Sequence, residues 1–275
     1  MEAQKIQGSA KGLTLDNGAE LTYCELGENH DEVIVCGAFC FITFMPMIKK
    51  LAEKYHVYGV VMRFDGKADE INGDGSTNWS RQWGSDVYQL AKTLNLPKFH
   101  YFGKCHGSVP GWYLAKNHPE CLKTLSSFFL APHTKNPNSN HWFDVLKNSG
   151  ALEMLKAGLR YPESGIGAKM AEMGAFKNVD PTIIPKYAVN FAQHIWSSIE
   201  DCVKTLENIE IPVEYLFGTD DLFFQDHFDS NIFAIMHTKN SRAMILNGER
   251  HFMEIDCPDK IAHEVDTFIE SSGTI

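Results

Sequence analysis

Short apolar segments alternate with segments of helical periodicity along most of this chain, and this alternation limits the fold more than any other feature. Between the apolar segments lie stretches with helical spacing; one of them, with Val87, Leu90 and Leu94, predicts a helix from Trp83 to Leu94. A loop rich in Gly, Asp and Asn is expected before it, at residues 65–78. Alternating strands and helices predict an α/β fold with a mostly parallel, doubly wound sheet. The expected buried strands are residues 32–36, 56–64, 99–103, 125–131, 213–217 and 243–246.

An antiparallel hairpin is expected at the N-terminal edge of this sheet. Residues 12–15 and 20–24 flank Asn17-Gly18, a dipeptide typical of hairpin turns because both residues tolerate positive φ. After residue 131 the alternation stops for about seventy residues, which is too long for a structureless loop. We therefore expect a core formed by residues 1–133 and 209–275, with a helical cap inserted at residues 134–208.

Composition excludes several classes of function. The 275 residues include 25 Lys and Arg against 35 Asp and Glu, a net charge of −10 with no basic block, which disfavours binding to nucleic acid or anionic membranes. No segment approaches the roughly 20 apolar residues of a membrane span, and the first residues lack the apolar core of a signal peptide. The seven cysteines include no C-x-x-C pair, so neither a disulfide framework nor a zinc ribbon is expected. We expect a cytoplasmic protein, and a homo-oligomer is left open.

The turn after residues 99–103 carries the most specific motif. Gly103-Lys104-Cys105-His106-Gly107 is a G-x-C-x-G pattern, which corresponds to the nucleophile elbow G-x-S-x-G with Cys in place of Ser. Glycine two positions away on either side lets the strand reverse sharply into a helix. Cys105 would then lie beside a helix N-terminus, which stabilises the reactive thiolate. A buried structural thiol beside a tight turn is the alternative for Cys105.

Two later segments complete a resemblance. Residues 213–217 run into Gly218-Thr219-Asp220-Asp221, and residues 243–246 run into a loop that contains His251. With these segments the chain resembles the α/β-hydrolase fold superfamily of capped esterases, lipases and C–C hydrolases, over nearly its whole length outside the insert. The resemblance implies Cys105 as nucleophile, Asp221 as acid and His251 as general base. Asp220 is the nearest rival of Asp221.

The resemblance also implies an oxyanion hole made of backbone amides. In the family a His-Gly-x turn follows the third strand, and the corresponding segment here is Cys36-Gly37-Ala38-Phe39, with Cys in place of His. The amide of Ala38 or of Phe39 would pair with that of His106, the residue after the nucleophile. Lys104 and His106 either add positive charge beside the thiolate or point sideways into the protein, and the second alternative is the simpler.

Aromatic residues near these segments have two interpretations. They either line an apolar or aromatic acyl pocket beneath the cap or belong to the core. Because thiolate is a good nucleophile and a good leaving group, activated acyl groups suit it best. The residues assigned to this pocket are Phe41, Phe44, Phe223 and Phe224.

The predicted function is hydrolysis of an ester, thioester or lactone of a small-molecule acyl substrate through an S-acyl enzyme. Dienelactone hydrolases resemble the chain in carrying Cys at the elbow, but they lack a helical cap. Acyl transfer through the same intermediate, C–C hydrolysis or lyase chemistry, and ligand binding without catalysis are the alternatives. A Ser→Cys replacement in a serine hydrolase would give the same sequence. The chain has no metal or dinucleotide motif, so no metal and no cofactor is expected.

Overall fold

The computed structural model describes residues 10–38, 41–129, 132, 195–221 and 224–273. Within these ranges the side chains at 38, 41, 42 and 224–227 are not described. The cap expected at residues 134–208 therefore lies outside the described residues, apart from its last portion, 195–208. No helix in the described ranges is long and apolar enough to cross a membrane.

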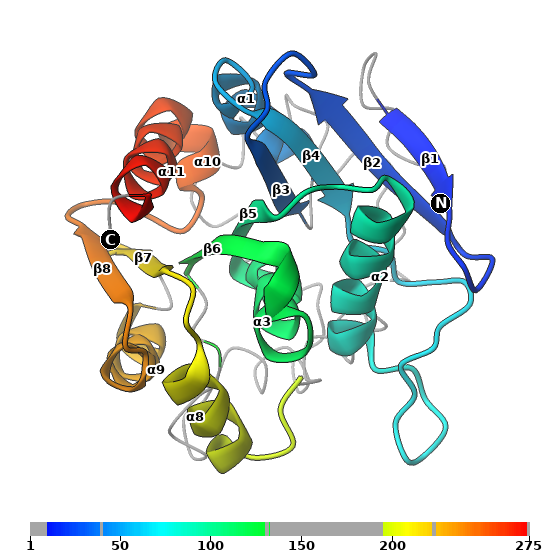
Figure 1. The fold of residues 1–275 in the computed structure, drawn as a ribbon. Coiled ribbons are helices and arrows are strands. Elements are labelled where there is room, and N and C mark those ends of the chain that lie inside the picture. The colour runs from blue at the N-terminus through cyan, green and yellow to red at the C-terminus, as the bar shows by residue number, and fades with distance from the viewer. Residues whose placement is uncertain (1–9, 39–40, 130–131, 133–194, 222–223, 274–275) are drawn as a thin grey trace, which may run out of the picture.

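A single twisted sheet forms the centre of the described part of the chain, in the order β1-β2-β4-β3-β5-β6-β7-β8 (Figure 1). β1 and β2 pair antiparallel with each other, β2 pairs antiparallel with β4, and the remaining neighbours are parallel. The predicted doubly wound sheet with an antiparallel N-terminal hairpin is confirmed. The strands are β1 (Ala10–Thr14), β2 (Glu20–Leu26), β3 (Val33–Ala38), β4 (His56–Val61), β5 (Phe99–Lys104), β6 (Leu122–Phe128), β7 (Val213–Gly218) and β8 (Ser241–Leu246).

The turn between β1 and β2 differs in detail from the expected one. Only Gly18 has a positive φ, of 79°, whereas Asn17 contributes its side chain. The Asn17 Oδ1 accepts a hydrogen bond from the Ala19 amide at 2.9 Å. Asn17 therefore acts as a turn-forming acceptor, and glycine alone supplies the left-handed conformation.

Helices cover both faces of the sheet (Figure 1). α1, α10 and α11 lie on one face, whereas α2, α3, α8 and α9 lie on the other. Two short 3-10 turns, η1 (Cys105–Gly107) and η2 (Pro119–Cys121), flank α3. The helices are α1 (Phe41–Leu51), α2 (Trp79–Thr93), α3 (Ser108–Asn117), α8 (Ile199–Asn208), α9 (Phe224–His237), α10 (Met253–Asp256) and α11 (Pro258–Ser272).

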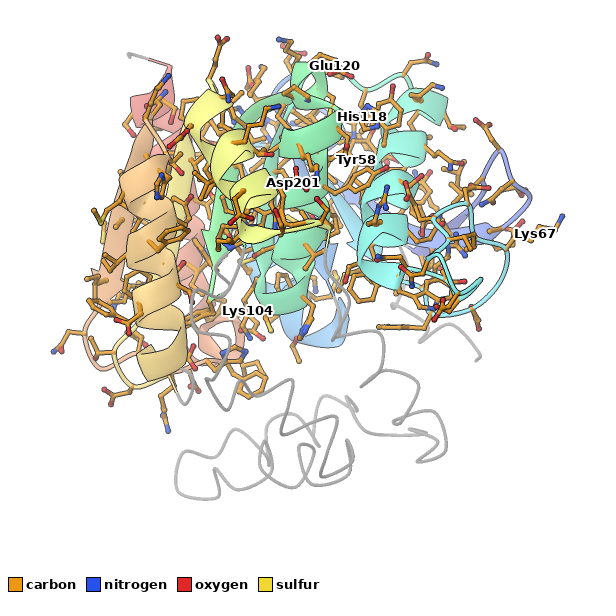
Figure 2. All side chains as sticks on the ribbon, turned by 90° about the horizontal axis from the view of Figure 1, so that it is seen from below. Tyr58, Lys67, Lys104, His118, Glu120 and Asp201 are labelled. Carbon is orange, nitrogen blue, oxygen red and sulfur yellow. The ribbon has the colours of Figure 1, made fainter. Side chains whose placement is uncertain are left out.

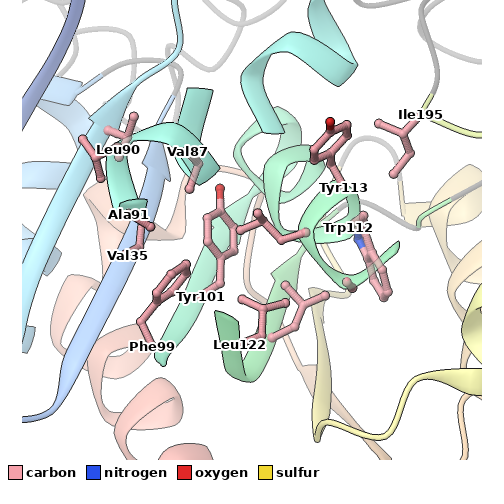
Figure 3. Close-up of a cluster of buried hydrophobic side chains, with 14 of the residues drawn as sticks. Val35, Val87, Leu90, Ala91, Phe99, Tyr101, Trp112, Tyr113, Leu122 and Ile195 are labelled. Carbon is pink, nitrogen blue, oxygen red and sulfur yellow. The ribbon is translucent and has the colours of Figure 1, made fainter. Parts of the chain in front are cut away.

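The strand side chains alternate between two hydrophobic clusters, one on each face. On β3, Val33 and Val35 join the cluster beneath α2 and α3, and Ile34 and Cys36 join the cluster beneath α1 and α11. Figure 3 shows the first cluster, where Tyr101 of β5 lies among the side chains of α2 and α3. Burial on both faces explains why these strands are apolar runs instead of alternating patterns.

α2 begins earlier than the sequence periodicity indicated. The expected helix began at Trp83, but α2 starts at Trp79 because Asn78 caps it, its Oδ1 accepting from the Arg81 amide at 3.1 Å. Asparagine is a favoured N-cap because its side chain satisfies an otherwise unpaired amide of the first turn. The loop expected at residues 65–78 ends at this cap.

α8 packs against the core beside α3. Cys202 and Leu206 are fully buried and belong to the same cluster as Trp112 of α3. Lys116 at the end of α3 forms an ion pair with Asp201. α8 is thus joined to α3 by apolar contact and by charge.

Candidate active site

β5 ends at the elbow, and the backbone there is strained. Cys105 follows the strand directly and has a φ of 51°, in the left-handed region that residues with a side chain rarely adopt. Strain of this kind concentrates at functional sites and persists only where surrounding structure holds it. The Ser108 Oγ, one turn further on, donates to the Gly103 carbonyl at 2.7 Å and ties the helix start back to the strand end.

The close approach at the elbow explains the glycine before the nucleophile. A Cβ at Gly103 would lie 2.1 Å from the carbonyl oxygen of Gly107 and 2.6 Å from the Cα of Ser108. No Cβ is tolerated at such distances from backbone atoms. The expected role of this glycine in the sharp strand-to-helix reversal therefore has a steric basis.

The end of β3 lies against the elbow. The Tyr101 hydroxyl donates to the Gly107 carbonyl at 2.6 Å, and a Cβ at Gly37 would lie 2.1 Å from that hydroxyl oxygen. Gly37 thus lets β3 approach the elbow, and Ala38, the last residue of β3, follows it immediately. Of the three amides considered for an oxyanion hole, those of Ala38 and His106 belong to these two adjoining segments, and Phe39 lies outside the described residues.

His251 and Asp221 are brought together at the ends of β8 and β7. The His251 Nδ1 and the Asp221 Oδ2 are 2.9 Å apart, and both side chains are buried. Asp220 is exposed, and its Oδ1 accepts from the Thr219 hydroxyl at 3.1 Å. Between the two acids considered from the sequence, Asp221 is the one that contacts the imidazole.

Charge interactions shift the thiol and the imidazole in opposite directions. Burial alone would lower the pKa of His251, but Asp221 outweighs it, with a further contribution from Cys105, and the pKa rises to about 9. Burial likewise would raise the pKa of the half-buried Cys105 thiol, but His106 and His251 outweigh it and hold that pKa well below its ordinary value. Both shifts favour the ionised forms, a thiolate at Cys105 and an imidazolium at His251.

The two residues that flank Cys105 have different surroundings. The His106 Nδ1 lies 3.2 Å from the Cys105 Sγ, and the His106 side chain is buried. Lys104 instead points into the protein, where its Nζ donates to the Glu254 Oε1 at 2.9 Å. The simpler alternative from the sequence therefore holds for Lys104, whereas His106 faces the sulfur.

Lys104 and Glu254 form a buried ion pair next to the site. The Lys104 Nζ also lies 4.5 Å from the centroid of the Phe252 ring, the residue after His251. Figure 2 shows Lys104 at the end of the molecule opposite His118 and Glu120, as expected for the carboxyl end of β5. The positive charge of Lys104 acts to lower the pKa of His251, against the effect of Asp221.

Two aromatic rings lie against the His251 imidazole, and neither contact was expected from the sequence. The Phe129 ring centroid is 5.3 Å from that of His251, and the Phe252 centroid is also 5.3 Å away. Phe129 follows β6 with a φ of 57°, an uncommon conformation for an aromatic residue. Only Phe252, next to His251 in the chain, could have been associated with the site from sequence position.

The expected pocket residues are only partly described. Phe44 is buried in the cluster beneath α1, with its ring centroid 6.0 Å from that of Phe102. This placement matches the core alternative. Phe39 and Phe223 lie outside the described residues, and the side chains of Phe41 and Phe224 are not described. Within the ranges that the structure describes, no group of three or more His, Cys, Asp or Glu residues is arranged to hold a metal ion.

Comparison with known proteins shows the fold. No protein-family model matches the chain. The (E)-2-((N-methylformamido)methylene)succinate hydrolase of Acinetobacter baylyi is 21% identical over 96% of this chain and 99% of its own length. The enol-lactonase of Burkholderia xenovorans superimposes with a TM-score of 0.72 at 18% identity, covering 94% of this chain and 100% of that one. An esterase of a Rhodococcus species gives a TM-score of 0.71 at 18% identity, covering 96% and 99%. The protein has the α/β-hydrolase fold.

Proposed function

We propose that the protein is a hydrolase that attacks an ester, thioester or lactone carbonyl with Cys105, assisted by His251 and Asp221. The observation that carries the proposal is the His251 ring, held at 2.9 Å by Asp221 and interacting electrostatically with a thiol in a strained elbow. The similar proteins support it, since they are named as a hydrolase, an enol-lactonase and an esterase. A helical cap at residues 134–208 is part of this proposal.

Acylation begins from the ion pair. The Cys105 thiolate attacks the carbonyl carbon, a C–S bond forms, and the carbonyl electrons move to the oxygen. The amides of His106 and Ala38 are the proposed donors to this oxyanion. When the intermediate collapses, the bond to the leaving group breaks, and His251 gives its proton to the departing atom. Cys105 is now a thioester, and His251 is neutral.

Deacylation uses the neutral imidazole that acylation leaves behind. His251 takes a proton from water while the water oxygen attacks the thioester carbonyl, and Asp221 stabilises the imidazolium that forms. Collapse of the second tetrahedral intermediate breaks the C–S bond and releases the acid. The thiolate and the imidazolium are regenerated. Each turnover therefore consumes one water molecule, and the enzyme returns to its starting protonation state.

The substrate proposed is a small molecule with an apolar or aromatic acyl group and an activated leaving group. A thiolate is expelled readily from a tetrahedral intermediate. The intermediate formed from an unactivated amide would therefore expel Cys105 and return to substrate more often than it would expel the amine. We also place the enzyme in a reducing compartment, the cytoplasm. The cysteines of the described ranges, among them Cys24 and Cys36, are free thiols, which fits that environment.

Mass spectrometry after incubation with a p-nitrophenyl ester tests the proposal. The acyl adduct should map to Cys105 and disappear in Cys105→Ala, together with turnover. Cys257→Ala is the matched control, because burial and Glu249 raise the pKa of that half-buried thiol to about 12 and make it unreactive. Undiminished turnover in Cys105→Ala would refute the proposal, and ester products formed with added alcohols would show acyl transfer instead of hydrolysis.

A further inference from the structure

We propose that His106 is a second catalytic imidazole, which hydrogen bonds the Cys105 thiolate through attack and departure and so frees His251 for proton transfer. The inference rests on the proposed function of Cys105 as a nucleophile. It assigns separate roles to the two histidines at the Cys105 sulfur, with His106 as hydrogen-bond donor to the sulfur and His251 as the group that transfers protons. The carrying observation is the distance of 3.2 Å between the His106 Nδ1 and the Cys105 Sγ.

The position of His106 is fixed by the fold. Its backbone forms the middle of η1, directly after Cys105, whose φ is strained, and two positions before Ser108, the first residue of α3. The His106 side chain is 4% exposed and Cys105 is half-buried, so the contact with the sulfur is largely shielded from bulk water. A hydrogen bond to a charged acceptor is stronger in such surroundings than at the surface.

The two histidines and the lysine around the sulfur differ in what else they bind. His251 approaches from the loop after β8 and is bound to Asp221, so its proton serves the leaving group and the attacking water. Lys104 has its ammonium bound to Glu254 in a buried ion pair. Both imidazoles interact with the sulfur, but the proposed proton route passes through His251, whereas His106, whose Nδ1 lies 3.2 Å from the Sγ, stands outside that route. It can therefore remain a donor at every stage of the cycle.

A donor that stays in place affects two steps. In acylation it keeps the sulfur ionised whatever the protonation state of His251. In deacylation the sulfur leaves as a thiolate, and His106 stabilises the negative charge that develops on it at that moment. Both effects follow from one hydrogen bond, and neither requires His106 to gain or lose a proton.

Replacing the two histidines should therefore slow different steps of the cycle. Without His251, the thiolate should still form and become acylated by an activated ester, but the S-acyl enzyme should accumulate because nothing activates water. Without His106, the thiol should hold its proton to higher pH, and acylation itself should slow. If the two histidines had the same role, both variants would be slowed at the same step.

The test measures alkylation of Cys105 by iodoacetamide as a function of pH, together with single-turnover acylation by a p-nitrophenyl ester. In His106→Leu the midpoint of the alkylation profile should move up by about one pH unit or more, so that alkylation below that midpoint slows about tenfold. His106→Asn should recover part of the shift, because its amide nitrogen can take the place of Nδ1. The control pair is His263→Leu and His263→Asn on the exposed surface of α11, where no shift is expected.

The outcomes separate this inference from the proposed function. An unchanged alkylation profile in a folded His106→Leu or His106→Asn would overturn the role of His106 while leaving Cys105 as nucleophile. If His106→Leu does not fold, His106→Asn decides alone, since the inference requires it to shift the midpoint measurably. An absent S-acyl adduct in the unmodified enzyme, with turnover retained in Cys105→Ala, would instead overturn the proposed function itself.

Discussion

Replacing Gly103 by Ala would place a methyl group against the backbone of the elbow. The new Cβ would lie 2.1 Å from the Gly107 carbonyl oxygen, which would have to retreat by about 1.3 Å to reach the 3.4 Å where ordinary contact begins. Because the opposing atoms are backbone, the elbow itself has to move. Overpacking of this kind costs about 3 kcal/mol at the upper end of its usual range, which corresponds to a fall in Tm of roughly 6–12 °C.

The same displacement should reduce activity. A shift of about 1 Å at a reacting group costs about a hundredfold in rate, so kcat/KM for a p-nitrophenyl ester should fall by about that factor in Gly103→Ala. Calorimetry and steady-state kinetics measure the two effects. Gly73→Ala is the control, because nothing lies within 4 Å of a Cβ at Gly73. If Gly103→Ala melts and turns over like Gly73→Ala, the steric account of the elbow is wrong.

Two further results are expected from the charges around the site. Lys104→Met and Glu254→Met should each lower the free energy of unfolding by about 3–5 kcal/mol, because each single change leaves one buried charge unpaired. The double variant Lys104→Met/Glu254→Met should lose much less than the sum of the two. Urea unfolding would measure this, and strictly additive losses would count against it. His251 keeps its proton up to a pKa of about 9, so kcat/KM for an alkyl ester, which needs that proton on its leaving group, should fall above about pH 9. The aryloxide of an aryl ester leaves without a proton, so kcat/KM for an aryl ester should show no such fall. Equal pH profiles for the two esters would contradict the assigned role of His251.

The sheet could be predicted, and so could the meeting of Cys105, Asp221 and His251 at one of its edges, because local patterns encode the strands that these residues follow. Apolar runs buried on both faces indicate parallel strands, and parallel strands bring the residues that follow them to one edge. The start of α2 was also encoded, since Asn78 is a favoured capping residue, but the apolar period by itself placed the helix four residues late. Apolar periodicity misplaces the start of this helix because a polar cap, and not an apolar contact, begins it.

Other features of the site depend on contacts that no local pattern encodes. The ion pair between Lys104 and Glu254 joins residues 150 positions apart. The position of Phe129 against His251 depends on a left-handed backbone at an aromatic residue, which its side chain does not favour. Whether His106 faces the sulfur depends likewise on the conformation of Cys105, so the sequence left two alternatives where the structure has one.

The pairing of Lys104 with Glu254 has a consequence for transplanting this elbow into another scaffold. The pentapeptide carries an ammonium group whose counter-charge, among the described residues, is Glu254 on α10, beyond the histidine. A recipient that lacks an acid there would have to enclose an unmatched cation, at a cost of several kcal/mol. Anyone grafting the cysteine motif would therefore need to carry the acidic residue along with it, or exchange the lysine for an apolar side chain first.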